Sequence, residues 1–498
     1  MKRGIAFGLG WLLFLLVLSV PAPAGMSGSA QRVAATVALM SVWWIGEALP
    51  LAATALVPLV LFPALGVTGV KQVASSYAEH LIFLFLGGFL IAAAIQKWGL
   101  HRRIALWVLR AVGTQPARVV LGFMLATAVL SMWISNTATA MMMYPIAMAV
   151  VEALCGTLPA ELQPQERERI RKSFGLVVML AVAYSASIGG VGTLIGTPPN
   201  VVLAGQYATL FPEAPPLTFL SWMLLALPVV ALMLPVAWLY LVHFAAPVRI
   251  REVARQLRPE MLEQRGLSPD TKLRGPELCV LVVFVLTALL WVFRADIDLG
   301  SVRVPGWSRW LPNPAFVTDA TVAIAMGLVL FAIPVDRKFN RFVLDWSAAK
   351  DLPWGVLLLF GGGFAIARGM ADSGLSSWIG DQLGGLQSVP VPVVVLICCV
   401  VVMLLTEVTS NTAVAAMMLP IVASLAGRLD VPPLLVMLPT TLAASFAFVL
   451  PVATPPNAIV MGSGWVTIPQ MARTGLMLDL IGLVVIVGVS LGLGPLLL

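Results

Sequence analysis

The sequence predicts an all-α membrane protein that crosses the bilayer many times. Of its 498 residues, 60% are hydrophobic and only 11% are charged, whereas a soluble globular protein carries about 25% charged residues. Apolar runs of about 20 residues, the length that spans a hydrocarbon core, recur from one end of the chain to the other. The sequence lacks the short alternating strands that are typical of a membrane β-barrel.

Apolar length and breaker residues place eleven spans along the chain. They fall near residues 4–22, 31–48, 50–68, 80–98, 174–210 (interrupted), 217–247, 276–293, 315–334, 352–370, 432–463 (interrupted) and 471–496. Two further apolar segments, 118–154 and 389–427, carry the triplet Ser-Asn-Thr in their middles, and we interpret them as re-entrant hairpins. The stretch at 101–112 is typical of an amphipathic helix at the membrane surface.

The charges in the loops orient this arrangement. With a cytoplasmic N-terminus, 23 of the 30 lysines and arginines fall on the cytoplasmic side and 7 outside, as the positive-inside rule requires. The loop at 248–275 is then cytoplasmic and the loop at 294–313 external. The net charge of +7 therefore indicates a membrane protein and no nucleic-acid partner. Residues 1–24 fit an uncleaved first span or a cleaved signal peptide, and both interpretations stay open.

The two halves of the chain repeat one another. "LIFLFLGGFL" at 81–90 matches "VLLLFGGGFA" at 356–365, and "ISNTATAMMMYPI" at 134–146 matches "TSNTAVAAMMLPI" at 409–421, both in one register without gaps. A second pair, "GTPPN" and "ATPPN", lies closer together in the chain, and we attribute the difference to an extra polar loop at 156–173. An odd number of predicted crossings separates the copies, so the second is inverted. Inverted repeats are typical of secondary transporters, whose sites lie near the midplane where the repeats meet.

The repeated segments carry the chemistry of a binding site. Glycines and paired prolines break the spans at 187–200 and 448–457, and broken helices offer N–H groups to anions and carbonyl groups to small cations. Ser, Asn and Thr add neutral donors and acceptors, and no basic residue lies in either triplet or either TPPN segment. A lone triplet would be explained by hydrogen bonds within and between helices. Two copies in register favour a site that takes a hard cation and a carboxylate together.

Other classes of protein fit the sequence less well. A channel needs an open polar path through several spans, and an enzyme needs a nucleophile with its base or a metal cluster. The four cysteines match no zinc pattern. We therefore expect a carrier and not an enzyme.

These motifs, together with "WWIGEALPLAATALVPLVLFPALGV" at 43–67, resemble the divalent-anion:sodium symporter family. The resemblance implies eleven spans plus two re-entrant hairpins, a homodimer in the lipid bilayer, and an elevator mechanism. It divides the chain into scaffold (1–112), transport domain (113–247), cytoplasmic loop and second scaffold part (248–388), and second transport part (389–498). The localisation it implies is the plasma membrane, or the inner membrane of a Gram-negative source.

The resemblance also assigns roles to individual residues. Sodium ions would be held by two sets of ligands: Ser131, Ser135, Asn136 and the backbone of Gly196, and Thr406, Thr409, Asn411 and the backbone of Ala453. The substrate carboxylates would contact seven residues of the triplets and broken helices: Asn136, Thr137, Thr197, Asn411, Thr412, Thr454 and Pro455. We expect Na⁺-coupled import of C4-dicarboxylates such as succinate, malate and fumarate. Sodium-independent exchange, a citrate or sulfate substrate, the sodium stoichiometry and the role of Glu407 stay open.

Overall fold

The computed structural model describes residues 2–113, 115–156, 162–245, 273, 275–298, 303–336, 340–383, 385 and 388–497. Among these residues, eight helices are long and apolar enough to cross a membrane, and six shorter apolar helices accompany them. The strands β1 (Ile297–Asp298) and β2 (Arg303–Val304) form a short antiparallel pair in the loop predicted to be external. The predicted all-helical, multi-spanning fold is confirmed. Most of the predicted cytoplasmic loop at 248–275 lies outside the described residues.

The first half of the chain begins with a group of helices that the sequence assigns to the scaffold. They are α1 (Lys2–Ser19), α2 (Gly28–Ile45), α3 (Leu51–Thr54), α4 (Val57–Ala64), α5 (Val70–Ser76), α6 (His80–Lys97) and α7 (Leu100–Val112). The helices that follow contain the first triplet and the first broken span. They are α8 (Pro116–Ser131), α9 (Asn136–Cys155), α10 (Pro164–Gly190), α11 (Pro198–Leu210) and α12 (Phe219–Tyr240), which continues into a π-helical turn at Leu241–Ala245.

The second half repeats this order. Its scaffold-type helices are α15 (Gly275–Val292), α16 (Asp319–Ala332), α17 (Trp346–Lys350), α18 (Trp354–Asp372) and α19 (Leu375–Gln382), with 3₁₀ turns at Trp307–Trp310 and Pro314–Phe316. The helices with the second triplet and broken span are α20 (Val391–Thr406), α21 (Asn411–Leu429), α22 (Leu434–Ala444), α23 (Pro455–Met461) and α24 (Ile468–Leu497).

Two stretches differ from the prediction. The span expected at 50–68 is broken into α3 and α4, because the ring of Pro58 is incompatible with a helical carbonyl four residues earlier, and α3 ends at that residue, Thr54. The polar loop expected at 156–173 is helical from Pro164 onward. Proline is favoured at the first turn of a helix, and Glu168 pairs with Arg171 across one turn at 2.9 Å.

Helix α10 forms the centre of the bundle around the first hairpin. Every residue of its second part, from Phe174 to Gly190, is buried, as expected for a helix that is apolar on all sides. It packs against α8, α9, α12 and α23. Glycine permits the closest approaches, since a Cβ at Gly175 would run into the ring of Trp465 and one at Gly189 into the backbone of Ala128.

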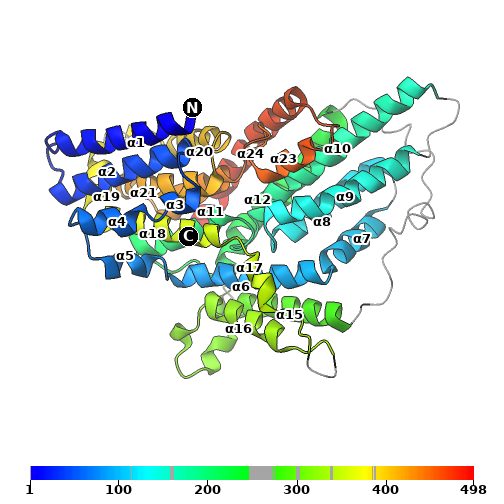
Figure 1. Cartoon of the computed structure of the whole chain (residues 1–498), viewed down its shortest axis with the longest axis horizontal. Coiled ribbons are helices and arrows are strands. Elements are labelled where there is room, and N and C mark those ends of the chain that lie inside the picture. The colour runs from blue at the N-terminus through cyan, green and yellow to red at the C-terminus, as the bar shows by residue number, and fades with distance from the viewer. Residues whose placement is uncertain are drawn as a thin grey trace.

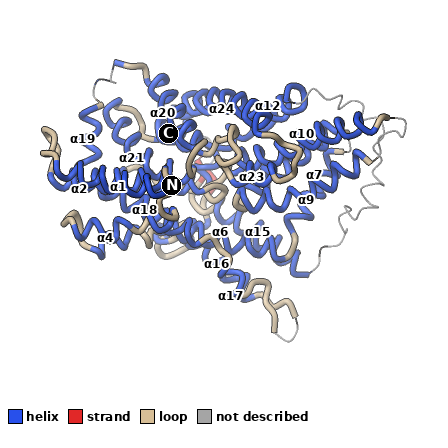
Figure 2. The backbone as a smooth tube through the Cα atoms, turned by 45° about the horizontal axis from the view of Figure 1, so that its top comes forward, coloured by secondary structure: helices blue, strands red, loops and turns tan. Residues whose placement is uncertain are grey.

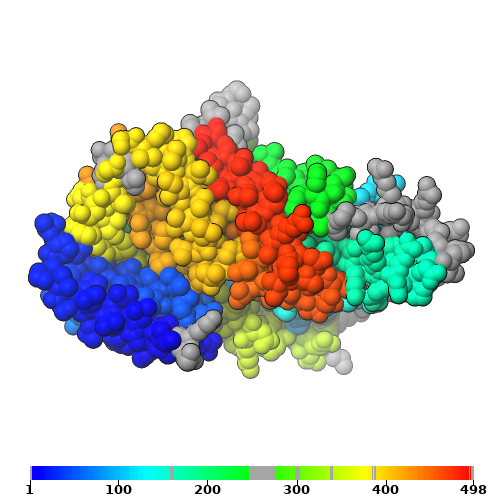
Figure 3. All heavy atoms as spheres, turned by 90° about the horizontal axis from the view of Figure 1, so that it is seen from above, coloured from blue at the N-terminus to red at the C-terminus, as the bar shows by residue number. Residues whose placement is uncertain are grey.

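The two triplet-bearing hairpins lie in different halves of the molecule. Figure 1 shows α8 and α9 toward one end of the long axis and α21 toward the other, and Figure 2 shows α9 and α21 in the same arrangement. In the space-filling view the blue N-terminal helices and the cyan residues lie at opposite ends, with gold-to-red residues of the second half between them (Figure 3). Helix α11 packs against α21 and α22, and α10 against α23, so the broken spans connect the two halves. The division into scaffold and transport domain stays a prediction.

Candidate functional site

Each Ser-Asn-Thr triplet forms the turn at the tip of its hairpin. Ser135 caps α9, and its Oγ accepts a hydrogen bond from the N–H of Ala138 at 3.3 Å. Ser410 caps α21 in the same way, accepting from the N–H of Ala413 at 3.5 Å. Serine is among the best N-cap residues because its side chain satisfies a backbone donor that the helix leaves free. The polar triplets in apolar surroundings are thus explained locally by the two tight turns.

A buried hydroxyl lies behind each tip. Ser131 Oγ is 2.7 Å from Asn136 Oδ1 and 2.7 Å from the carbonyl oxygen of Ala186. Its counterpart, Thr406 Oγ1, is 2.6 Å from Asn411 Oδ1 and 2.8 Å from the carbonyl oxygen of Ala444. Each hydroxyl has one proton to donate and two oxygens beside it. These clusters therefore hold more acceptors than donors, which suits a hard cation that binds oxygen.

The broken helices contain a second network that is repeated in both halves of the chain. Asn200 Nδ2 donates to the carbonyl oxygens of Gly190 at 3.2 Å and Thr193 at 2.7 Å. Asn457 Nδ2 donates to those of Ala447 and Leu450, both at 3.0 Å. Both asparagines are fully buried. They brace the loops before α11 and α23, a role that sequence reasoning missed although the repeated Asn of TPPN was its signal.

The N-termini of α11 and α23 supply fewer N–H groups than the sequence suggested. Thr197 and Thr454 are the N-cap residues, and two prolines follow each of them in the first helical turn. Proline has no N–H, so the expected anion-binding N–H groups are missing there. Donors remain at the hairpin tips instead, because the first N–H groups of α9 and α21 have no acceptor within their own helices.

A cavity of about 660 Å³ joins both tips and both broken helices. Most of the predicted site residues line it: Ser135, Asn136, Thr137, Gly196, Thr197, Thr409, Asn411, Thr412, Ala453, Thr454 and Pro455. Ser131 and Thr406 do not reach its surface and are fully buried behind it. Among the described residues that line the cavity, none is a lysine, an arginine or a histidine.

Another part of the cavity lining comes from residues that the sequence did not single out as site residues. Phe85, Phe89 and Gln96 of α6 line it, with Glu47 before α3 and Asp351 before α18. Phe85 is matched in the repeat by Phe360, and their rings are in edge contact at 5.1 Å. An aromatic residue within an apolar span is normally a packing residue, so composition gave no sign that α6 faces the cavity.

Thr409 makes a contact that the resemblance did not imply. Its hydroxyl donates to the carbonyl oxygen of Trp44 at 3.2 Å and so ties the second tip to α2. The repeat places Ile134 at the corresponding position, whereas Ser410 corresponds to the predicted ligand Ser135. The two tips therefore share a serine, Ser135 or Ser410, and differ at the preceding residue, which is Ile134 in the first and Thr409 in the second.

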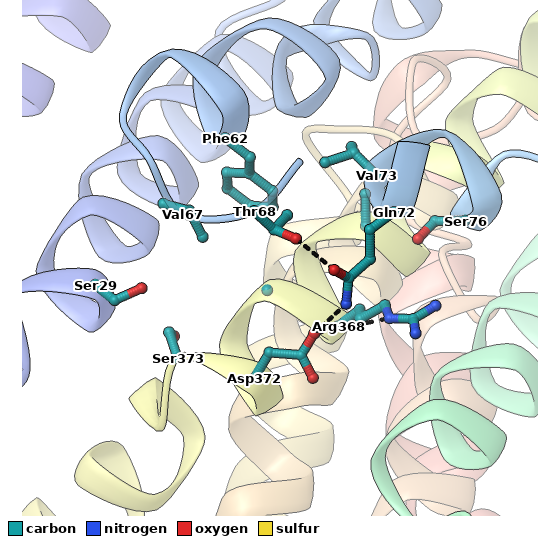
Figure 4. Close-up of a pocket in the computed structure, with 12 residues that line it drawn as sticks. Ser29, Phe62, Val67, Thr68, Gln72, Val73, Ser76, Arg368, Asp372 and Ser373 are labelled. Carbon is teal, nitrogen blue, oxygen red and sulfur yellow. Dashed lines mark hydrogen bonds and ion pairs between the residues drawn. The ribbon is translucent and has the colours of Figure 1, made fainter. Parts of the chain in front are cut away.

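A second cavity, of about 420 Å³, lies between α2, α4, α5 and α18 (Figure 4). Its polar side chains bond to one another: Gln72 Nε2 donates to Asp372 at 3.4 Å, Thr68 donates to Gln72 at 2.7 Å, and Arg368 lies 3.7 Å from Asp372. It contains none of the predicted site residues. The hairpin cavity is thus the one in which the predicted residues converge.

Paired hairpins and paired broken helices around one shared cavity define a multi-pass secondary transporter. The comparison with family models matches residues 8–498 to the sodium:sulfate symporter transmembrane region. The chain belongs to this family, the divalent-anion:sodium symporters that its motifs resemble, and it is a membrane transporter and not an enzyme.

Curated relatives extend over nearly the whole chain. The sodium-dependent dicarboxylate transporter SdcS of Staphylococcus saprophyticus is 40% identical over 488 residues, which are 98% of this chain and 90% of that protein. SdcS of Staphylococcus aureus (strain bovine RF122) is 42% identical over 482 residues, 96% of this chain and 89% of that protein.

Two solved structures share the fold at low sequence identity. The YdaH transporter of Alcanivorax borkumensis superposes with a TM-score of 0.59 at 15% identity, covering 92% of this chain and 97% of that one. MtrF of Neisseria gonorrhoeae superposes with a TM-score of 0.56 at 11% identity, covering 84% and 83%. At these identities the likeness concerns the fold alone.

Proposed function

We propose that this chain couples Na⁺ to the import of C4-dicarboxylates such as succinate, malate and fumarate by alternating access. The observation that carries the proposal is the single cavity in which two oxygen-rich hairpin tips face two broken helices. Relatives named as sodium-dependent dicarboxylate transporters, about 40% identical over nearly the full length, support the choice of substrate and ion. Sodium is then cargo that moves with the substrate and not a resident cofactor.

The cation sites lie where acceptors outnumber donors. The first comprises Ser131, Ser135, Asn136 and the carbonyl of Gly196, and the second comprises Thr406, Thr409, Asn411 and the carbonyl of Ala453. Gly196 supports the first assignment, because a Cβ built there would lie 3.0 Å from the carbonyl oxygen of Ser131. The backbone of Gly196 therefore lies close to the carbonyl oxygens of Ser131 and Gly190.

The substrate site is built from neutral groups. Asn136, Thr137, Asn411 and Thr412 begin α9 and α21, so their N–H groups and side chains can donate to carboxylates. The hydroxyls of Thr197 and Thr454 face the same cavity, and Pro455 borders it. The N-termini of α9 and α21 each contribute roughly half a unit of positive charge, which is less than a dianion requires. Bound Na⁺ adds the full positive charges that no described side chain of the lining supplies.

The direction of access follows from the loop charges. Glu47, Gln96 and Asp351 line the cavity at the ends of spans that the charge distribution assigns to the cytoplasm. In that orientation the cavity opens inward, and an elevator movement of the transport domain would expose it outward. A homodimer in the plasma membrane, with a cytoplasmic N-terminus, completes the proposal.

Uptake of radiolabelled succinate into proteoliposomes tests the proposal. Uptake should require an inward sodium gradient, and the apparent affinities should rise reciprocally, sodium favouring succinate and succinate favouring sodium by the same factor. Uptake that ignores sodium but needs internal dicarboxylate would identify the exchanger instead. Competition by citrate or sulfate stronger than that by malate and fumarate would move the substrate to those anions.

A further inference from the structure

We infer that Glu407 is a positioning residue that sets the geometry of the second cation site through the loop before α23. The inference rests on the proposed function, because it concerns the sodium site assigned to Thr406, Thr409, Asn411 and Ala453. Glu407 follows the last residue of α20 at the second hairpin tip, and its side chain is buried, with 8% of its surface exposed. Its role was open in the sequence.

The Glu407 carboxylate holds two consecutive peptide groups of that loop. Oε1 accepts from the N–H of Val449 at 3.0 Å, and Oε2 accepts from the N–H of Leu450 at 2.9 Å. Asp479 of α24, also buried, lies beside this carboxyl group. Hydrogen bonds to a charged acceptor are stronger than those between neutral groups.

Leu450 passes this constraint to the cation site. Its carbonyl oxygen accepts from the N–H of Ala453 at 3.2 Å and from Asn457 Nδ2 at 3.0 Å. The peptide groups on either side of Leu450 are therefore fixed to the hairpin tip and to the start of α23. The position of Ala453, whose carbonyl is assigned to the second sodium site, is therefore constrained by its hydrogen bond to Leu450.

The first repeat contains the same pair of hydrogen bonds at the equivalent positions. The carbonyl oxygen of Thr193 accepts from the N–H of Gly196 at 3.3 Å and from Asn200 Nδ2 at 2.7 Å. When "GTPPN" is aligned with "ATPPN", these three residues correspond to Leu450, Ala453 and Asn457. In each repeat, the residue whose carbonyl is assigned to the cation site is thus held by a hydrogen bond to one loop residue, Thr193 or Leu450.

The two repeats differ in the hydrogen bond that joins this loop residue, Thr193 or Leu450, to the hairpin. In the first repeat the hydroxyl of Thr193 donates to the carbonyl oxygen of Met132. Met132 is the counterpart of Glu407 in the register that aligns the two triplets, and Thr193 is the counterpart of Leu450. In the first repeat the loop residue contributes its side chain and the hairpin residue its backbone. In the second repeat the loop residue contributes its backbone and the hairpin residue its side chain. A structural carboxylate unrelated to the site would not be expected to replace this connection at the equivalent position.

This difference suggests a test in which the hydrogen bond of the first repeat is introduced into the second repeat. Glu407→Met removes the carboxylate and installs the residue of the first repeat, and Glu407→Met/Leu450→Thr also supplies the hydroxyl. In sodium titrations of succinate uptake, we expect the single variant to raise the half-saturating sodium concentration by about tenfold or more, with the maximal rate at saturating sodium retained. The double variant should recover most of that shift, and Leu450→Thr alone should behave as wild type.

The outcomes separate this inference from the proposed function. Wild-type uptake without sodium dependence would defeat the proposed function. Sodium-dependent wild type with an unchanged sodium requirement in Glu407→Met would overturn only the role of Glu407. So would a lower maximal rate at an unchanged sodium requirement, or a double variant no better than the single one. If Glu407→Met does not fold, Glu407→Gln replaces it, since its amide keeps one acceptor. A raised sodium requirement supports the inference and an unchanged one refutes it.

Discussion

At the scale of single residues, Asn136 and Asn411 are the side chains on which both ligands depend in the proposed site. Each amide oxygen lies against a buried hydroxyl behind its tip, at 2.7 and 2.6 Å respectively, and each residue also lines the cavity. The pair therefore connects the oxygen clusters, where sodium is proposed to bind, with the surface that meets the substrate.

Asn136→Ala and Asn411→Ala should each raise the half-saturating concentrations of sodium and of succinate. Loss of a hydrogen bond to a charged group predicts an increase of roughly tenfold or more for each ligand. Uptake measured over a grid of sodium and succinate concentrations checks this, with Asn313→Ala in an exposed loop as the control for a change of the same type. Normal affinities in both variants would leave the triplets with a purely structural role as turns.

A surface ion pair gives a residue-scale prediction about pH. Lys97 Nζ lies 2.5 Å from Asp345 Oδ2 and joins α6 to the start of α17. Hydrogen bonds from Lys97 and then from Ser347 lower the pKa of Asp345 from 3.8 to about 2. A carboxyl group with a lowered pKa stabilises the folded state above its unfolded pKa, and this contribution is lost as the pH falls through the folded value.

Asp345→Asn should therefore lower the unfolding temperature slightly at neutral pH, and the difference from wild type should vanish as the pH falls from 3.8 toward about 2. The effect is small because the pair is exposed to solvent. Thermal unfolding of the detergent-solubilised protein across a pH series measures it. Lys97→Met removes the same interaction and should give the same profile, so a different pH dependence in that variant would contradict the assignment.

At the scale of elements, the hairpin of α8 and α9 presents two neighbouring positions with opposite environments. Ala138 lines the cavity, whereas Thr139 is fully buried within the bundle. The sequence alone does not distinguish the two positions, since Thr139 follows the triplet by only two residues. The helical turn at the tip separates them, because successive residues of a helix point in directions about 100° apart.

Cysteines at these two positions test whether the hairpin tip is exposed to water. Ala138→Cys should react with a water-soluble thiol reagent and be protected by succinate in the presence of sodium, while Thr139→Cys should react slowly in all conditions. The labelling of wild type, which contains four native cysteines, sets the baseline. Equal reaction of both variants, unaffected by ligand, would favour two complete spans over a re-entrant hairpin.

At the scale of the whole molecule, the orientation in the membrane determines the side on which the cavity opens. Asn313 lies in the loop predicted to be external, and Gln165 near the start of α10 lies on the predicted cytoplasmic side; both are exposed. In intact cells, a membrane-impermeant thiol reagent should label Asn313→Cys and spare Gln165→Cys until the cells are permeabilised. The reverse pattern would invert the orientation and place the cavity opening outside.

The sequence predicted those features that depend on local chemistry or on the repeat. Span length, paired prolines and Ser N-caps act within a few residues, so the broken helices and the two tips could be located in advance. The common register of the repeats then indicated which segments should meet. The resemblance supplied the residues of the candidate site, and nearly all of them border one cavity.

What escaped prediction depends on partners that are distant in the chain. The hydroxyl of Thr409 bonds to Trp44 in the first half of the chain, and the carboxylate of Glu407 bonds to the loop that precedes α23. Phe85 and Phe89 line the cavity but read as ordinary apolar residues of a span. The helical start of α10 at Pro164 was missed because a run of charged residues was interpreted as a loop, although those residue types also favour helices.

The described lining of the cavity contains no basic side chain, and this has a consequence for energy conversion. If two sodium ions accompany each dicarboxylate dianion, loading adds no net charge to the cavity, and the fully loaded and the unloaded carrier present the same charge to the bilayer. A carrier with sodium alone, or with the dianion alone, presents an excess that is costly to move through a medium of low dielectric constant. Partly loaded forms would therefore stall, and little of the ion gradient would be dissipated in futile cycles. A lysine fixed in the lining would remove this safeguard, because the carrier could then move the dianion with less sodium.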